Sequence, residues 1–416
     1  MSKLKLGLFG FGCVGSGLYE VLSQSKFTGA ELIKIVVKNK DKQRKPILVP
    51  FSYNPNEILE DDEINVVIEL INDSSEAYRI IKAALIRKKH VVTANKKVLS
   101  EHLDELIQLA QQNGVSLLYE AAVAGSIPII RNLEEYYNND SLTSIDGILN
   151  GTTNYILSQV NDGKDYQTAL KLAQDEGFAE SNPTLDIHGF DAAYKLTLLI
   201  KHAFGLTIQI NQVLTVGIQK INKEDLNYSN EKKYKVKLVA RAFKDNGKLF
   251  AFVAPHFTSS NQNLFNVENE FNAISVQASF ADKQLFYGKG AGSLPTASAV
   301  LSDVSSLLYD YKYEYKKTND SNLVFSDDRF VKIYLGSEDV NNLSKIRFYN
   351  SDEFYVSKNY SFRIGIVRLT DLIKIDWNKQ NDVSLILFSD LFDENLDSKQ
   401  LTNFEFLNRN SNYSIH

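Results

Sequence analysis

The chain has 416 residues, of which 44% are hydrophobic and 23% are charged, and at roughly 100–200 residues per domain it allows two to four globular domains. The net charge of −5 gives no reason to expect nucleic-acid binding, and no stretch reaches the roughly 18–20 apolar residues of a membrane-spanning helix. The one cysteine, Cys13, excludes an internal disulfide framework. No apolar signal core precedes the first predicted strand, so we expect a cytoplasmic protein.

Strand and helix patterns alternate over the first 120 residues. The expected strands are 4–9, 31–37, 65–70, 90–93 and 115–120, and the expected helices are 14–24, 75–88 and 101–113. Such alternation is typical of a parallel, doubly wound α/β sheet of the Rossmann type, which we place at residues 1–130.

The pattern changes after this block. Helices are expected at 127–137, 166–176 and 188–204, a hairpin at 233–257, and strands at 144–149, 273–280 and 284–288. These elements predict an α+β catalytic and dimerisation domain over 131–310, whose helix at 295–310 could pack back on the first domain. A polar linker at 310–327 then precedes strands at 329–336, 360–367 and 382–389, which predict a small α+β domain over 325–416.

A glycine-rich turn follows the first strand. Gly10, Gly12 and Gly15 match the Gly-x-Gly-x-x-Gly pattern of dinucleotide-binding turns, and both the strand and the helix that this pattern requires are predicted. The three glycines permit a tight turn, close approach of a pyrophosphate and close helix packing. Cys13 and Val14, inside the turn, offer backbone contacts to the cofactor. The alternative is an ordinary turn that binds nothing.

The end of the second strand bears on the choice of cofactor. NAD-binding folds usually have Asp or Glu there for the ribose hydroxyls, whereas this chain has Val37-Lys38-Asn39. Lys38 would attract a 2′-phosphate, so the sequence favours NADP(H), with use of NAD(H) as well left open. Lys38 could also belong to a solvated basic loop.

Two further segments carry charged residues where a ligand would bind. Lys96 follows the fourth strand, at the sheet edge where α/β proteins bind ligands, although a solvated lysine at a helix entry is the simpler reading. Asp191 and Lys195 are four residues apart and share one helix face. The residues around Lys195 are apolar, which favours a buried, functional pair over a surface ion pair. We interpret His188, at the helix start, as a capping or surface residue.

Together these segments resemble the homoserine dehydrogenase family. The matching stretches are Gly-Phe-Gly-Cys-Val-Gly at 10–15, Val-Val-Ile-Glu-Leu-Ile at 66–71, His-Val-Val-Thr-Ala-Asn-Lys at 90–96, residues 119–130, Asn-Gly-Thr-Thr-Asn-Tyr-Ile-Leu at 150–157, residues 180–195, and residues 288–300. They cover about residues 1–310. The resemblance implies reversible NAD(P)H-dependent reduction of L-aspartate 4-semialdehyde to L-homoserine, in threonine, methionine and isoleucine biosynthesis.

The resemblance also implies roles for single residues. Lys195 matches the proton donor, Glu180 and Asp191 match the substrate-binding acids with Asp186 close by, and Lys96 matches a lysine near cofactor and substrate. Gly177 and Gly290 match backbone positions beside the nicotinamide. A lysine near its ordinary pKa of about 10.4 is protonated at neutral pH and suits aldehyde reduction.

Family members can hold a monovalent cation, sodium, with a structural role. By resemblance its ligands would be mainly carbonyl oxygens, of Glu120, Val123, Gly125 and Ile127, and a plain loop is the alternative. The resemblance further implies a homodimer or higher homo-oligomer that contacts its partner through the middle sheet.

The chain departs from the family at two places. Asn72-Asp73 replaces a glycine pair after the third strand, which affects the loop on the nicotinamide side. The C-terminal strands suit an ACT-like βαββαβ module, but the usual Asp-x-Pro-Gly turn is missing. Threonine regulation through this module is therefore an open question, and a degenerate dimerisation module is the alternative.

Two alternative functions fit the sequence less well than that of a homoserine dehydrogenase. Another amino-acid dehydrogenase on the same scaffold, such as an aspartate dehydrogenase, is disfavoured by residues 180–195. A cofactor-sensing protein with an inactive catalytic domain is disfavoured because Lys195 and the acids are all present.

Overall fold

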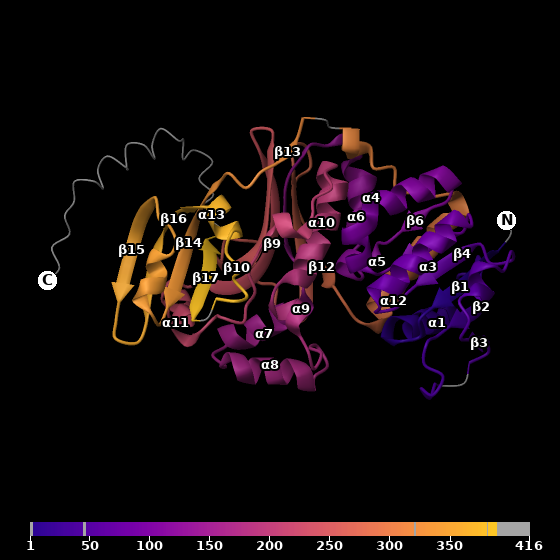
Figure 1. The fold of residues 1–416 in the computed structure, drawn as a ribbon, viewed down its shortest axis with the longest axis horizontal. Helices are drawn as coiled ribbons and strands as arrows, with labels where there is room; N and C mark the ends of the chain where they lie inside the picture. Colours follow the sequence, from indigo (N-terminus) through magenta and orange to yellow (C-terminus); the bar gives the residue numbers. More distant parts are fainter. Residues whose placement is uncertain (1–2, 45–46, 320–321, 381, 389–416) are drawn as a thin grey trace. The chain divides into compact units, whose positions relative to one another are not determined.

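The computed structural model describes residues 3–44, 47–319, 322–380 and 382–388. These residues form two compact units that are interleaved along the chain (Figure 1). Unit 1 consists of Met1–Leu142, Tyr194–Ile210 and Phe286–Ser321, and unit 2 consists of Thr143–Ala193, Asn211–Leu285 and Asn322–His416. The division into residues 1–130, 131–310 and 325–416 stays a prediction.

Unit 1 contains the expected parallel sheet. Its six strands lie in the order β3-β2-β1-β4-β5-β6, and all neighbouring strands are parallel. The strands are β1 (Leu4–Phe9), β2 (Ala30–Val36), β3 (Phe51–Ser52), β4 (Val66–Glu69), β5 (His90–Thr93) and β6 (Leu117–Leu118). This is the doubly wound order, in which the chain changes direction across the sheet between β1 and β4 and leaves a ligand-binding crevice at their carboxyl ends.

Helices accompany this sheet (Figure 1). They are α1 (Cys13–Gln24), α2 (Asn56–Leu59), α3 (Ser74–Ile86), α4 (Lys96–Asn113), α5 (Ala121–Ala124), α6 (Ile129–Glu134) and α12 (Ser293–Ser306). Helix α12 comes from a later part of the chain and packs closely against α1. The absence of a side chain at Gly17 permits this approach, because a Cβ there would clash with Ser293. Helix α4 begins five residues earlier than expected, since the Asn95 side chain caps it by accepting the Val98 N–H.

Unit 2 is built on a mixed sheet that has eleven strands among the described residues, and the first residue of β7 and the last residues of β12 belong to unit 1. The main path runs β12-β11-β7-β9-β10-β17-β14-β16-β15, and β8 and β13 both pair with β10. Its strands are β7 (Leu142–Ile148), β8 (Leu214–Thr215), β9 (Lys235–Asp245), β10 (Lys248–Thr258), β11 (Phe271–Ala278), β12 (Asp282–Lys289), β13 (Val324–Phe325), β14 (Phe330–Ser337), β15 (Asn350–Val356), β16 (Ser361–Arg368) and β17 (Val383–Phe388). The expected hairpin is confirmed as β9 and β10, which turn at Asn246-Gly247 with positive φ at both residues.

The C-terminal strands continue this sheet instead of forming a separate one. Strand β17 pairs with β10 in parallel and with β14 in antiparallel orientation. The chain order is strand, 3-10 segment (Val340–Ser344), two strands, helix α13 (Leu369–Ile373) and strand, so a βαββαβ order is present with its first helix reduced to a 3-10 segment. Strand β15 was not expected, because it begins with the polar run Asn350-Ser351-Asp352-Glu353.

Besides α13, unit 2 contains α7 (Gly151–Asn161), α8 (Tyr166–Asp175), α9 (Thr184–Ile187), α11 (Lys223–Glu231) and the first turn of α10 (Phe190–Phe204), whose residues from Tyr194 onward belong to unit 1. Of the charged residues predicted for the site, Asp186 lies on α9 and Asp191 in the first turn of α10. The expected helix at 188–204 is confirmed as α10, which begins two residues later because Gly189, with a φ of +82°, separates it from α9. In the described part of the chain, no helix has the length and apolar character needed to cross a membrane.

Candidate active site

The glycine turn lies between β1 and α1 as expected, and its geometry explains two of the three glycines. Gly10 has a φ of +95°, and a Cβ there would lie 2.5 Å from the carbonyl oxygen of Leu70. A Cβ on Gly15 would lie 2.3 Å from the carbonyl oxygen of Gly10. Gly12, the N-cap of α1, has open space where its Cβ would be and no side chain caps the helix. The uncapped N-terminus of α1 can therefore receive a pyrophosphate group.

Cys13 and Val14 occupy the first turn of α1. Cys13 is exposed and Val14 is half-buried. The carbonyl of Cys13 accepts a hydrogen bond of 2.7 Å from the Ser293 hydroxyl, so the start of α12 fastens the glycine turn. Ser293 lies in the stretch 288–300 that carries the resemblance, but its contact with Cys13 is 280 residues apart in the sequence and could not be predicted from it.

Lys38 lies just beyond β2 and extends into solvent, with 94% of its side chain exposed. Its Nζ is 3.8 Å from Asp73 Oδ2, while Asp73 Oδ1 caps α3 by accepting the Glu76 N–H. An exposed ion pair of this length contributes less than about 1 kcal/mol and holds Lys38 only loosely. Lys38 can therefore turn toward a phosphate at the end of β2.

A buried carboxyl group orders the loops that follow β4 and β5. Glu69 Oε1 accepts the Ile71 N–H at 2.7 Å, and Oε2 accepts the Thr93 hydroxyl at 2.6 Å. Burial raises the pKa of Glu69 to about 7, and the hydrogen bonds from Thr93 and Ile71 offset only part of that rise. Asn95 adds a bond from its side chain to the Ile71 carbonyl. Lys96 follows as the first residue of α4, so this network places it at the carboxyl edge of the sheet.

Glu69 was not among the predicted site residues. The available signal was an acid at the end of the apolar run Val66-Val67-Ile68, where both faces of a parallel sheet are buried.

The segment expected to hold a cation is a short helix and its exit. Glu120 is the N-cap of α5, Val123 lies within it, and Gly125 ends it with a φ of +54°. A Cβ on Gly125 would lie 2.6 Å from the carbonyl carbon of Gly290, so the structure brings two expected site glycines together. The Glu120 carboxylate is already used at the start of α6, where it accepts the N–H groups of Ile130 and Arg131 at 2.8 Å.

Side-chain metal ligands do not gather elsewhere in the part of the chain that is described: no group of three or more His, Cys, Asp or Glu side chains is placed to hold a metal ion. A cation at residues 120–127 would depend on carbonyl oxygens, which a helix end such as that of α5 leaves without intrahelical partners.

Helix α10 carries both Asp191 and Lys195 of the motif at residues 180–195. Asp191 is in its first turn and Lys195 one turn later, so their side chains lie on the same helix face. Both are buried, with relative exposures of 4% and 7%. Two buried charges one turn apart are not a solvated surface pair, and burial of this kind requires partners or a function.

The other acids of the motif lie in unit 2. Asp186 is in α9, and the amide of Asn150 joins it to Asp191 by donating to Asp186 Oδ1 at 2.7 Å and to Asp191 Oδ2 at 2.8 Å. Glu180 is exposed, and its backbone carbonyl accepts a hydrogen bond from the Gln174 side chain. Gly177 has a φ of +79° with open space around it. Asn150 belongs to the Asn-Gly-Thr-Thr-Asn-Tyr-Ile-Leu stretch that carries the resemblance, but its contacts with the two acids were not predictable from that stretch.

Comparison with known proteins identifies these motifs. The family model for the NAD binding domain of homoserine dehydrogenase matches residues 10–120, and that for homoserine dehydrogenase matches residues 128–305. A homoserine dehydrogenase of Bacillus subtilis is 35% identical over 369 residues, which cover 83% of this chain and 84% of the relative.

Solved structures show the same likeness. The crystal structure of a homoserine dehydrogenase from Thiobacillus denitrificans superimposes with a TM-score of 0.80 at 30% identity, covering 94% of this chain and 99% of the other. A hyperthermophilic archaeal homoserine dehydrogenase mutant in complex with NADPH has a TM-score of 0.65 at 27% identity, covering 75% of this chain and 99% of the other.

Proposed function

Since this chain belongs to the homoserine dehydrogenase family, we propose that its oxidoreductase activity, the reversible reduction of L-aspartate 4-semialdehyde to L-homoserine, uses Lys195 as the proton donor. The observation that carries this proposal is the burial of Asp191 and Lys195 on one face of α10. The reaction serves threonine, methionine and isoleucine biosynthesis.

Reduction of an aldehyde to an alcohol requires a proton donor beside the aldehyde oxygen. A reduced nicotinamide supplies a hydride to the aldehyde carbon, and negative charge develops on the aldehyde oxygen as the hydride arrives. The Lys195 ammonium stabilises that charge and gives its proton to the oxygen, which becomes the homoserine hydroxyl. In the reverse direction Lys195 must be neutral to accept the proton, so homoserine oxidation is expected to be faster at alkaline pH.

The acids of the motif bind the amino-acid part of the substrate. The substrate carries an ammonium group, and we assign its recognition to Glu180 and Asp191, with Asp186 beside Asp191. The Asn150 bridge supports the grouping of Asp186 with Asp191, because one amide contacts both carboxylates. Lys96, at the start of α4, is assigned a place near cofactor and substrate.

We propose NADP(H) as the preferred cofactor. Gly10, Gly12, Cys13, Val14 and Gly15 would hold the pyrophosphate, and the exposed Lys38 ammonium would pair with the 2′-phosphate. Gly177 and Gly290 would border the nicotinamide. The archaeal relative in complex with NADPH supports this preference, while NAD(H) remains the second cofactor to be tested.

Three further properties are proposed with this function. A sodium ion with a structural role would be held by the carbonyl oxygens of Glu120, Val123, Gly125 and Ile127. A homodimer or higher homo-oligomer would form through the mixed sheet, where Leu285 and Tyr287 on β12 are 43% and 54% exposed. The reaction would take place in the cytoplasm, consistent with a single cysteine.

The test of the proposed function is an assay of the purified protein with L-homoserine and each cofactor. We expect oxidation with NADP+ at a higher kcat/KM than with NAD+, and no oxidation of L-aspartate. Oxidation of aspartate would favour the other amino-acid dehydrogenase. Binding of NADPH without turnover of any substrate would favour a cofactor sensor.

A further inference from the structure

The side chain of Asn150 contacts three separate segments of unit 2. It precedes α7, it is buried with 5% exposure, and its Nδ2 lies within 2.8 Å of a carboxylate oxygen of both Asp186 and Asp191. These acids come from α9 and from the first turn of α10, 36 and 41 residues further along the chain. One amide therefore links two acids that belong to different helices.

The other half of the amide fixes its orientation. Asn150 Oδ1 accepts the Thr153 N–H at 2.8 Å and so caps α7, and the Thr153 hydroxyl lies 3.0 Å from the same oxygen. A flipped amide would place its NH₂ group against a backbone N–H and its carbonyl against two carboxylates. Only the observed orientation satisfies both sides.

The amide also suits the charges around it. Two carboxylates near one point repel each other, and each of the two Asn150 N–H groups can neutralise part of one of them. Each bond holds one oxygen of its carboxylate, so the amide contributes to how both Asp186 and Asp191 are turned. A carboxylate at position 150 would instead add a third negative charge.

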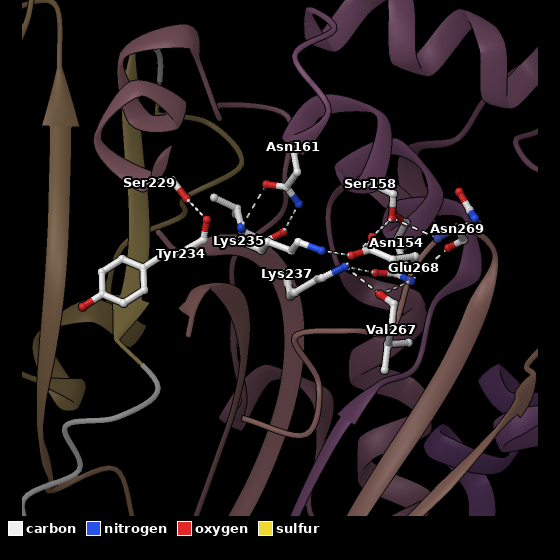
Figure 2. Close-up of polar contacts among 11 residues, drawn as sticks. Asn154, Ser158, Asn161, Ser229, Tyr234, Lys235, Lys237, Val267, Glu268 and Asn269 are labelled. Atoms are coloured by element: carbon white, nitrogen blue, oxygen red, sulfur yellow. Dashed lines mark hydrogen bonds and ion pairs between the residues drawn. The ribbon is translucent and has the colours of Figure 1, made fainter. Parts of the chain in front are cut away.

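Helix α7 is anchored by other residues, so a change at Asn150 need not displace it (Figure 2). Asn154 lies one turn further along α7, and its Nδ2 is 2.9–3.1 Å from three carbonyl oxygens that share its two N–H groups, those of Val267 and Asn269 in the loop before β11 and of Phe271 at the start of β11. Ser158 donates to Glu268 Oε2 at 2.7 Å. The fully buried Lys237 Nζ binds the Val267 carbonyl at 2.6 Å and Glu268 at 3.0 Å.

We propose that Asn150 is a positioning residue that sets the orientation of Asp191, which binds the substrate ammonium, and of Asp186 beside it. The proposal rests on the substrate-binding role assigned above to Asp191. It predicts that Asn150 acts on homoserine binding and not on cofactor binding.

The decisive variant is Asn150→Ser. Serine is as good an N-cap as asparagine, so α7 keeps its cap. The serine side chain has no amide, however, so the two hydrogen bonds to Asp186 and Asp191 are lost. We expect the KM for homoserine to rise at least about tenfold, the loss typical of a hydrogen bond to a charged group. The KM for NADP+ and the melting temperature should stay close to those of the unchanged protein.

A second variant separates positioning from a purely structural role by its pH dependence. Asn150→Asp also keeps the cap, but its carboxylate repels the other two. We expect a larger rise in the homoserine KM than with serine, and a partial recovery as the pH falls and the cluster takes up a proton. A purely structural role for Asn150 predicts instead that the KM for NADP+ rises and recovers together with the homoserine KM.

The matched control is Asp165→Ser, which exchanges the exposed N-cap of α8 in the same unit and should leave all kinetic constants unchanged. Asp191→Asn tests the assigned substrate role by itself. If Asp191→Asn raises the homoserine KM while Asn150→Ser does not, the positioning proposal is wrong and the proposed function stands. It is equally wrong if Asn150→Ser raises both KM values together and lowers the melting temperature. A protein that does not turn over homoserine overturns the proposed function first.

Discussion

Glu69 illustrates what burial does to a single side chain. It is fully buried at the carboxyl end of β4, where Thr93 and the Ile71 N–H hold both of its oxygens. The sequence shows an acid after three apolar residues, but its partner Thr93 lies 24 residues away on the neighbouring strand. The position and the residue type were visible in the sequence, whereas the contact depends on the pairing of β4 with β5.

The raised pKa of Glu69 predicts how stability changes with pH. Below pH 4.5, the ordinary pKa of this carboxyl group, Glu69 is protonated in both the folded and the unfolded chain, and its contribution to folding stability is fully present. As the pH rises from 4.5 to about 7, the unfolded chain ionises while the folded chain keeps the proton, so stability falls. The loss attributable to this group is at most about 3 kcal/mol.

Glu69→Gln removes this titration while keeping the shape and the acceptor for Ile71. As the pH rises from 4.5 to 8, we expect the free energy of unfolding of the variant to increase by about 1–3 kcal/mol relative to that of the unchanged protein. Chemical denaturation at several pH values measures this difference. Glu60→Gln, at an exposed position, is the control. A difference between the Glu69 variant and the unchanged protein that is the same at every pH contradicts the prediction.

Among the elements, helix α10 carries the residues proposed for the site in its first two turns, while hydrogen bonds to other segments hold its last turn. Its last turn carries His202, which is fully buried and lies 2.6 Å from Glu134 Oε1 and 2.8 Å from the Tyr119 hydroxyl. Glu134 also accepts the N–H groups of Glu314 and Tyr315, so one carboxylate ties α10 to the segment after α12. The helix itself was predictable from its spacing, but not its attachment, because the partners come from distant segments.

His202→Leu should cost about 1–3 kcal/mol of unfolding free energy, because the buried carboxylate and phenol each lose a hydrogen bond. His202→Gln retains polar atoms and should recover part of the loss. Thermal melts followed by circular dichroism provide the measurement, and a leucine variant as stable as the unchanged protein would show that these bonds contribute nothing.

At the scale of the whole molecule, the mixed sheet was the part least visible in the sequence. Strands β14, β16 and β17 were expected, yet their membership in one sheet with β9 and β10 was not, because the paired residues lie more than 100 positions apart. A shared core confirms that these strands belong together. It contains Phe243, Phe250 and Phe252 from the hairpin together with Ile333, Leu385, Leu387 and Trp377 from the C-terminal part.

Substitution in this core should be reported by Trp377, the one tryptophan in the chain, which is 4% exposed. Leu387→Ala is expected to cost about 2–5 kcal/mol, since Leu387 is fully buried between both groups of strands. Val356→Ala on β15, where the side chain is 54% exposed, should change stability by less than about 0.5 kcal/mol. Equal effects of the two variants on the denaturation curve would contradict a continuous core.

In the proposed mechanism, Lys195 gives the proton to the aldehyde oxygen. The direct measurement is the rate of NADPH oxidation with L-aspartate 4-semialdehyde by the Lys195→Ala variant, together with its NADPH affinity from fluorescence titration. We predict a fall in kcat of about 10²–10⁴-fold, the range for loss of a general acid, with NADPH binding changed less than about twofold. A variant that turns over the aldehyde at nearly the original rate would contradict the account.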